Sequence, residues 1–138
     1  MTPSGNIAIA RRVWEGIVQN AAAARGRAFS DPAWHPEVEY VEDPSWPGSG
    51  TYRGADRVGA RFSEYLEILG EVAVEVEEVR EVADDLVLSI WRMRGKTTTG
   101  YPYEQEWAWL WTFADGRIIR WQAFLDNEAA LEAAGVRE

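Results

Sequence analysis

The second half of the chain is a series of alternating, strand-like runs separated by tight turns. Apolar and polar residues alternate in four runs, which cover residues 71–83, 86–96, 103–113 and 117–125. Asp84-Asp85 and Asp115-Gly116 lie between runs, and Asp-Gly is a strong signal for a hairpin. Because strands joined by tight turns pair with their neighbours in antiparallel fashion, this pattern predicts an antiparallel meander.

Helix patterns flank this meander. Helices are expected at residues 7–24, 55–69 and 126–134, and one further strand at residues 38–43. Asp126 and Gly135 are expected to cap the last helix, His35-Pro36 to break a short turn, and residues 44–52 to form a loop. The order predicts a single α+β domain over residues 1–138, with helices packed on one face of a curved sheet.

The composition excludes several classes of partner. The formal net charge of −9 argues against nucleic acid and anionic membranes, because both attract clustered Lys and Arg. The chain has no Cys, which excludes a disulfide framework and a thiolate metal site. Residues 1–5 do not begin a signal peptide, and no apolar run approaches the roughly 20 residues of a membrane span. The sequence therefore predicts a cytoplasmic protein.

Eight tryptophans are the unusual component of the composition. An indole ring fills a core but carries an N–H group that needs an acceptor when it is buried. Trp107, Trp109 and Trp111 occupy alternate positions of one strand, so they share one face of the sheet. Three interpretations are open for that face: the wall of a ligand cavity, packing against the helices, or a dimer interface.

Asp43 lies at the end of the first predicted strand, in the segment Val41-Glu42-Asp43-Pro44. A carboxylate that faces an aromatic cavity has a raised pKa and can act as a base. Alternatively, Asp43 caps the turn at Pro44, and hydrogen bonds to the carboxylate then lower its pKa. The two interpretations therefore predict opposite pKa shifts for the same side chain.

Four segments carry a family resemblance: Val41-Glu42-Asp43-Pro44, the helix entry at residues 52–56, residues 113–118 and residues 122–126. They resemble the nuclear transport factor 2-like superfamily, which includes SnoaL-like polyketide cyclases and ketosteroid isomerases. The resemblance implies a cone-shaped α+β fold, in which a curved antiparallel (mixed) sheet carries the N-terminal helices on its concave face. It also implies a homodimer, because sheet-to-sheet dimers are common in this superfamily.

The closest catalytic resemblance is to the ketosteroid isomerases. There a carboxylate at the position of Asp43 transfers the proton, while a tyrosine and a protonated aspartic acid hold the enolate. The resemblance places Trp14 and Trp109 at these two donor positions. An indole N–H donates a hydrogen bond but has no acidic O–H, so this departure speaks against steroid isomerisation itself.

The resemblance therefore implies a cofactor-free isomerase or cyclase that uses Asp43 as acid and base on a small apolar carbonyl compound. The predicted substrate-binding residues are Trp14, Val41, Phe62, Tyr65, Trp91, Trp107, Trp109 and Trp111. No metal site is predicted, because the single histidine, His35, has only Glu37 and Glu39 nearby in the sequence. The alternative function is a non-catalytic domain of the same fold that binds an apolar ligand or dimerises.

Overall fold

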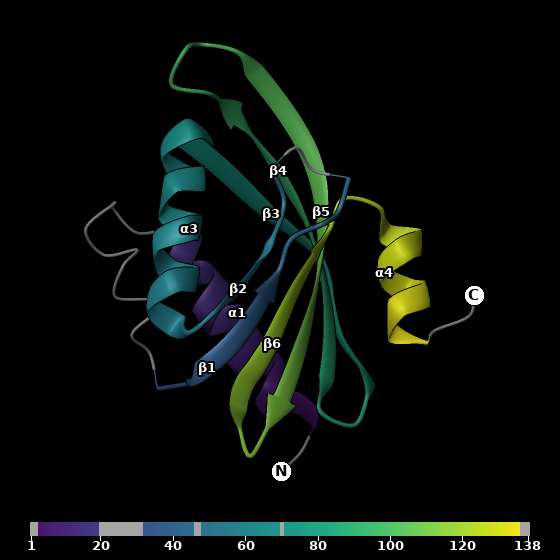
Figure 1. Cartoon of the computed structure of the whole chain (residues 1–138). Coiled ribbons are helices and arrows are strands. Elements are labelled where there is room, and N and C mark those ends of the chain that lie inside the picture. The colour runs from purple at the N-terminus through teal and green to yellow at the C-terminus, as the bar shows by residue number, and fades with distance from the viewer. Residues whose placement is uncertain (1–2, 20–31, 46–47, 70, 136–138) are drawn as a thin grey trace.

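The computed structural model describes residues 3–19, 32–45, 48–69 and 71–135. Within these ranges, a six-stranded sheet in the order β2-β1-β6-β5-β4-β3 is accompanied by three helices (Figure 1). The strands are β1 (Trp34–Val41), β2 (Thr51–Arg53), β3 (Glu71–Ala83), β4 (Leu86–Lys96), β5 (Pro102–Ala114) and β6 (Arg117–Phe124). The helices are α1 (Pro3–Gln19), α3 (Ala55–Leu69) and α4 (Asn127–Ala134). The predicted α+β class is confirmed.

The antiparallel meander predicted for the second half is confirmed. Strands β3 to β6 pair in sequence order, and each pair is antiparallel. Asp85 and Asp115 adopt positive φ angles of 58° and 51° in two of the turns, a conformation that Asp tolerates better than most residues. Register shifts interrupt the β3–β4 and β5–β6 pairs, and such bulges increase twist and bend a sheet.

The first half differs from the expected pattern at two points. β1 begins at Trp34, so His35-Pro36 lies inside a strand and is not the predicted break. Its parallel pairing with β6 is interrupted between Trp34 and Glu39, which accommodates a proline that has no N–H to donate. β2 lies within the segment expected to be loop, because three residues at a sheet edge are too short to show a period. Residues 20–31, which include the predicted end of the first helix, lie outside the described ranges.

Helices α1 and α3 pack on the concave face of the sheet, as predicted (Figure 1). Trp14 of α1 and Phe62 of α3 join the same buried cluster as Trp109 of β5. The next residue of β5, Leu110, points to the opposite face and belongs to a second cluster. The sheet is therefore apolar on both faces. No described helix is long and apolar enough to cross a membrane.

The short helix α4 lies on the opposite face, so the expectation that all helices share one face is wrong for α4 (Figure 1). Its predicted caps are confirmed: Asp126 accepts a hydrogen bond from the Glu128 N–H at 3.0 Å, and Gly135 ends the helix with φ of 77°. Ala130 is buried in one apolar cluster with Leu88, Ile90, Ala108 and Leu110. A dimer through this part of the sheet would have to displace α4, and the homodimer stays a prediction.

Candidate functional site

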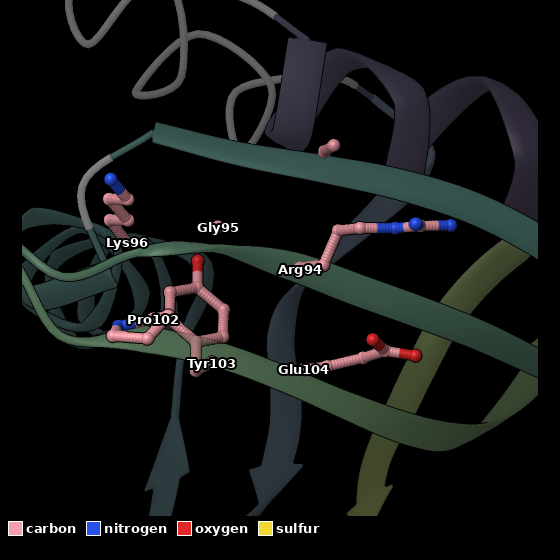
Figure 2. A pocket seen from close by; sticks show the side chains of 7 residues that line it. Arg94, Gly95, Lys96, Pro102, Tyr103 and Glu104 are labelled. Carbon is pink, nitrogen blue, oxygen red and sulfur yellow. The ribbon is translucent and has the colours of Figure 1, made fainter.

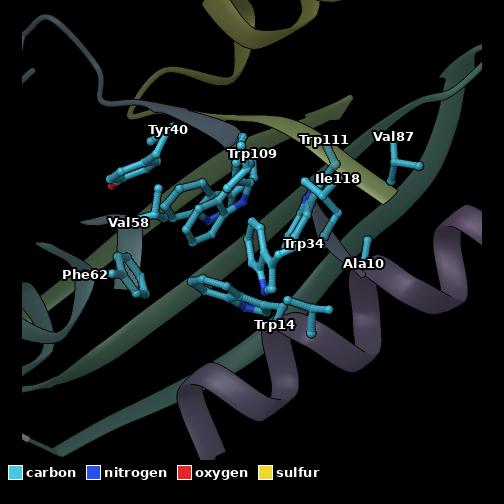
Figure 3. Close-up of a cluster of buried hydrophobic side chains, with 14 of the residues drawn as sticks. Ala10, Trp14, Trp34, Tyr40, Val58, Phe62, Val87, Trp109, Trp111 and Ile118 are labelled. Atoms are coloured by element: carbon cyan, nitrogen blue, oxygen red, sulfur yellow. The ribbon is translucent and has the colours of Figure 1, made fainter. Parts of the chain in front are cut away.

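Aromatic side chains from six elements converge between the concave face and the two N-terminal helices (Figure 3). We call this set the aromatic interior; its members are Trp14, Trp34, Tyr40, Phe62, Trp91, Trp107, Trp109, Trp111 and Trp121. The set arises because alternate positions of β5 face one side, and β1, β4 and β6 supply rings at neighbouring positions. Each of these residues is at most 7% exposed.

The rings of the aromatic interior contact one another directly. Trp109 stacks on Trp121 with ring centroids 4.2 Å apart and an interplanar angle of 16°. Trp107 is also stacked against Trp109, with centroids 6.0 Å apart and an interplanar angle of 15°. Trp14 and Trp109, which the resemblance placed at the two donor positions, lie together with centroids 5.2 Å apart. The structure therefore brings the two predicted donors to one place, and the indoles fill much of the space around them.

The indole N–H groups of this cluster differ in their hydrogen bonding. Trp111 Nε1 donates to Ser89 Oγ at 2.8 Å, and both residues are buried. The Nε1 atoms of Trp14, Trp91 and Trp109 are also buried, but they have no hydrogen-bond partner among the described residues. A buried donor without an acceptor costs about 1–3 kcal/mol, so these three N–H groups are the polar feature most suited to meet a ligand acceptor.

Of the other predicted substrate-binding residues, some lie in the aromatic interior and some do not. Phe62 belongs to the aromatic interior, with its ring 6.0 Å from Trp14 and 5.9 Å from Trp109. Val41 is half-buried and follows Tyr40 on the strand, so it points to the opposite side and is not part of the cluster. The side chain of Tyr65 lies outside the described part of the structure.

Asp43 is 8% exposed, and both of its oxygens accept hydrogen bonds. Oδ1 accepts from Ser45 N at 2.8 Å and Ser45 Oγ at 2.7 Å, and Oδ2 accepts from Leu125 N at 2.7 Å. Burial raises the pKa of Asp43, but the hydrogen bonds from Leu125 and Ser45 together outweigh it and hold the pKa below its usual value. This is the environment expected for the capping interpretation, and the acid/base role of Asp43 stays a prediction.

The adjacent acid, Glu42, is the functional candidate that the sequence reasoning missed. Its side chain is 4% exposed and forms a bidentate ion pair with Arg61 of α3, with Nε–Oε2 and Nη2–Oε1 distances of 3.0 Å. Gly50 N also donates to Glu42 Oε1 at 3.1 Å. The hydrogen bonds to Glu42 raise the pKa of Arg61. The signal was present in the alternation of β1, because Glu42 continues the buried side marked by Val38 and Tyr40.

The Glu42–Arg61 pair is contiguous with the aromatic interior. The Arg61 guanidinium lies over the Tyr52 ring, 5.4 Å from its centroid. Tyr52 stacks on Tyr40 at 6.3 Å, and Tyr40 stacks on Trp109 at 6.1 Å. A charged pair is thus connected to the stacked indoles through two tyrosine rings.

Two open hollows lie elsewhere on the surface. One, of about 710 Å³, is lined by Arg94, Lys96 and Tyr103 at the ends of β4 and β5 (Figure 2), and burial raises the pKa of Tyr103. The other, of about 380 Å³, includes His35 and Glu39. Neither is lined by a predicted substrate-binding residue. Among the described residues, no group of three or more His, Cys, Asp or Glu side chains is arranged to hold a metal ion.

Comparison with known proteins places the chain in a family. Residues 8–121 match the SnoaL-like domain, so the chain belongs to the SnoaL-like domain family. No curated protein matches the sequence.

Solved structures share the fold over nearly the whole chain. A protein named as a SnoaL-like polyketide cyclase from Jannaschia sp. CCS1 superposes with a TM-score of 0.76 at 20% identity, covering 100% of this chain and 98% of that one. TerC, co-crystallised with polyporic acid, gives 0.69 at 19% identity, with coverages of 95% and 98%. A protein with a ketosteroid isomerase-like fold from Catenulispora acidiphila DSM 44928, in complex with trimethylamine, gives 0.68 at 15% identity, with coverages of 94% and 93%. The predicted nuclear transport factor 2-like superfamily is confirmed.

Proposed function

We propose that this protein binds a small, apolar, carbonyl-containing molecule between the concave face of the sheet and helices α1 and α3. The observation that carries the proposal is the set of three buried indole N–H groups, on Trp14, Trp91 and Trp109, that have no acceptor among the described residues. A carbonyl oxygen is a hydrogen-bond acceptor, and flat rings can stack on the indoles around it. Ligand sites of this kind combine apolar walls with a few placed polar groups.

A ligand with a hydrogen-bond acceptor should bind this site more tightly than a plain hydrocarbon of the same shape. Both kinds of ligand gain from contact with the rings, but only a carbonyl satisfies a buried donor that is otherwise unpaired. A site built to hydrogen-bond a group discriminates strongly against an analogue that lacks it. Because the rings now contact one another, binding also requires the helices to move away from the sheet by the thickness of the ligand.

The test is a tryptophan-fluorescence titration with 9-fluorenone and with fluorene, which has the same ring system but no oxygen. We expect the ketone to bind at least about tenfold more tightly, the value of one hydrogen bond to a buried donor. Trp109→Phe should reduce that preference. Trp111→Phe is the matched control, because it lies on the same strand face but its N–H already bonds Ser89. Equal affinities for the two probes, or no binding of either, would contradict the proposal.

Acid/base catalysis by Asp43 is a second candidate, supported by the family membership and by the place of Asp43 at the end of β1. Because the hydrogen bonds keep its pKa low, Asp43 is ionised at neutral pH and would act first as a proton acceptor. General base catalysis contributes roughly 10²–10⁴-fold to a rate. Deuterium exchange at the α-carbon of an enolisable ketone such as 1-indanone, followed by NMR with and without Asp43→Asn, tests this step; 9-fluorenone has no α-hydrogen and cannot report it. Exchange that is unchanged in the variant would remove Asp43 as the base.

A further inference from the structure

We infer that the Glu42–Arg61 ion pair positions α3 over the aromatic interior and thereby controls how fast ligands enter and leave. The inference rests on the proposed function for its ligand readout, but it also concerns the exposure of the tryptophans without ligand. The packing of α3 against the sheet is its starting point. The main contacts of α3 with the sheet are to β1 and β2, which form one edge of it. The helix therefore extends from that edge across the concave face.

The inner side of α3 closes the aromatic interior. Val58 and Phe62 are at most 2% exposed. The Phe62 ring lies 5.2 Å from Trp121 and 6.3 Å from Tyr40, in edge-on arrangements. Any movement of α3 away from the sheet uncovers the rings beneath Phe62, so the stiffness of its attachment sets the access to them.

The Glu42–Arg61 ion pair joins α3 to the residue that directly follows β1. Two parallel N–H···O bonds of 3.0 Å fix both the distance and the direction of the guanidinium, which a single point contact does not. The Gly50 N–H donates a third hydrogen bond to the Glu42 carboxylate. Tyr52 supports the guanidinium through its ring face. Opening therefore has to break at least two charge-assisted hydrogen bonds at once.

A contribution to folding stability does not account for the Glu42–Arg61 ion pair. Replacing a buried ion pair by apolar residues of similar size is often neutral or stabilising, because desolvation of the charges offsets their attraction. Contact between two apolar side chains, however, has no directional preference, so α3 could shift relative to β1 with little loss of interaction energy. What the ion pair adds at this position is a defined geometry between the end of β1 and α3.

The experiment compares Glu42→Gln with Glu39→Gln. Glu39 lies on β1, three residues before Glu42, and its ion-pair partners are Arg53 of β2 at 3.3 Å and Arg120 of β6 at 3.1 Å, not a residue of α3. Glu42→Gln should raise acrylamide quenching of tryptophan fluorescence in the free protein. It should also speed 9-fluorenone association and dissociation in stopped flow by about tenfold, as expected for loss of a charge-assisted hydrogen bond. Because both rates rise, the Kd should change much less than either.

Three results would distinguish the positioning role of the ion pair from the alternatives. Quenching and exchange rates equal to those of the native chain and Glu39→Gln overturn the inference. The double variant Glu42→Met/Arg61→Met tests whether the pair acts by positioning α3 or by stabilising the fold. Faster association and dissociation of 9-fluorenone at native unfolding free energy supports the inference. Native rates of association and dissociation overturn it. If 9-fluorenone fails to bind the native protein, the proposed function falls. The quenching comparison then still decides the positioning role by itself.

Discussion

Replacing Asp43 by Asn changes stability in opposite directions under the two interpretations of this residue. In the structure, the ionised carboxylate accepts three hydrogen bonds, two from Ser45 and one from Leu125. Asn retains one oxygen but presents an NH2 group to the donors on the other side. Since a hydrogen bond to a charged group contributes about 1.5–3 kcal/mol, we expect Asp43→Asn to lower the free energy of unfolding by about 2–3 kcal/mol.

The same contacts define the pH dependence. The folded-state pKa of Asp43 is lowered, so its stabilising contribution is complete above the unfolded pKa of about 3.9 and is lost as pH falls through the folded pKa. The variant lacks this titration. The difference in unfolding free energy between the native chain and Asp43→Asn should therefore be largest near neutral pH and shrink below about pH 4.

Urea unfolding followed by tryptophan fluorescence at pH 7 and pH 3 measures both quantities. Asp115→Asn is the matched control, because Asp115 is an exposed turn residue with φ of 51°, which Asn also adopts. If Asp43 were instead a poorly satisfied, desolvated base, the neutral amide would remove the cost of burying a charge. An unchanged or increased unfolding free energy in Asp43→Asn would therefore refute the capping argument.

Two further predictions concern α4. Asp126→Ala removes the hydrogen bond to Glu128 N and should cost about 1 kcal/mol in urea unfolding, with the exposed Glu132→Ala as control; equal losses in the two would contradict the cap. Ala130→Asp places a charge against the apolar face of the sheet opposite to the concave one, and should detach α4. The uncovered apolar face should then cause self-association, which light scattering would detect. A variant that is folded and no more associated than the native chain would show that this face is not adhesive.

The sequence predicts most of the sheet because its strands are long and their turns are local. β3 to β6 alternate over 8 to 13 residues, and turn residues such as Asp115 lie between them. β2 has 3 residues and is held by pairing with β1, so no period was available to reveal it. β1 contains Pro36, which is a strand breaker in most contexts and is tolerated here where the pairing with β6 shifts.

The site was predictable in part, for a related physical reason. Alternation along β5 correctly placed Trp107, Trp109 and Trp111 on one face, since this depends on neighbours within the strand. The environment of Asp43 depends on Leu125, which is 82 residues away, and the order of residues carries no local record of that contact. The acceptor of the Trp111 N–H is likewise on another strand, 22 residues away.

The two adjacent acids at the end of β1 show what a carboxylate here can do. Glu42 is bound bidentately to Arg61, whose guanidinium lies over Tyr52, the first of the two tyrosines that lead to the indoles. Asp43 is bound by Ser45 and Leu125. Hydrogen bonds hold the pKa of Asp43 below its usual value, and both oxygens of Glu42 accept from Arg61, so neither carboxylate is without partners. Catalysis by either residue would first have to break its hydrogen bonds, at a cost of roughly 1.5–3 kcal/mol for each bond. Ligand binding loosens the Glu42–Arg61 pair when α3 moves, but it leaves the three hydrogen bonds of Asp43 intact and would give the unpaired indole donors an acceptor. The geometry therefore favours binding over proton transfer by Asp43.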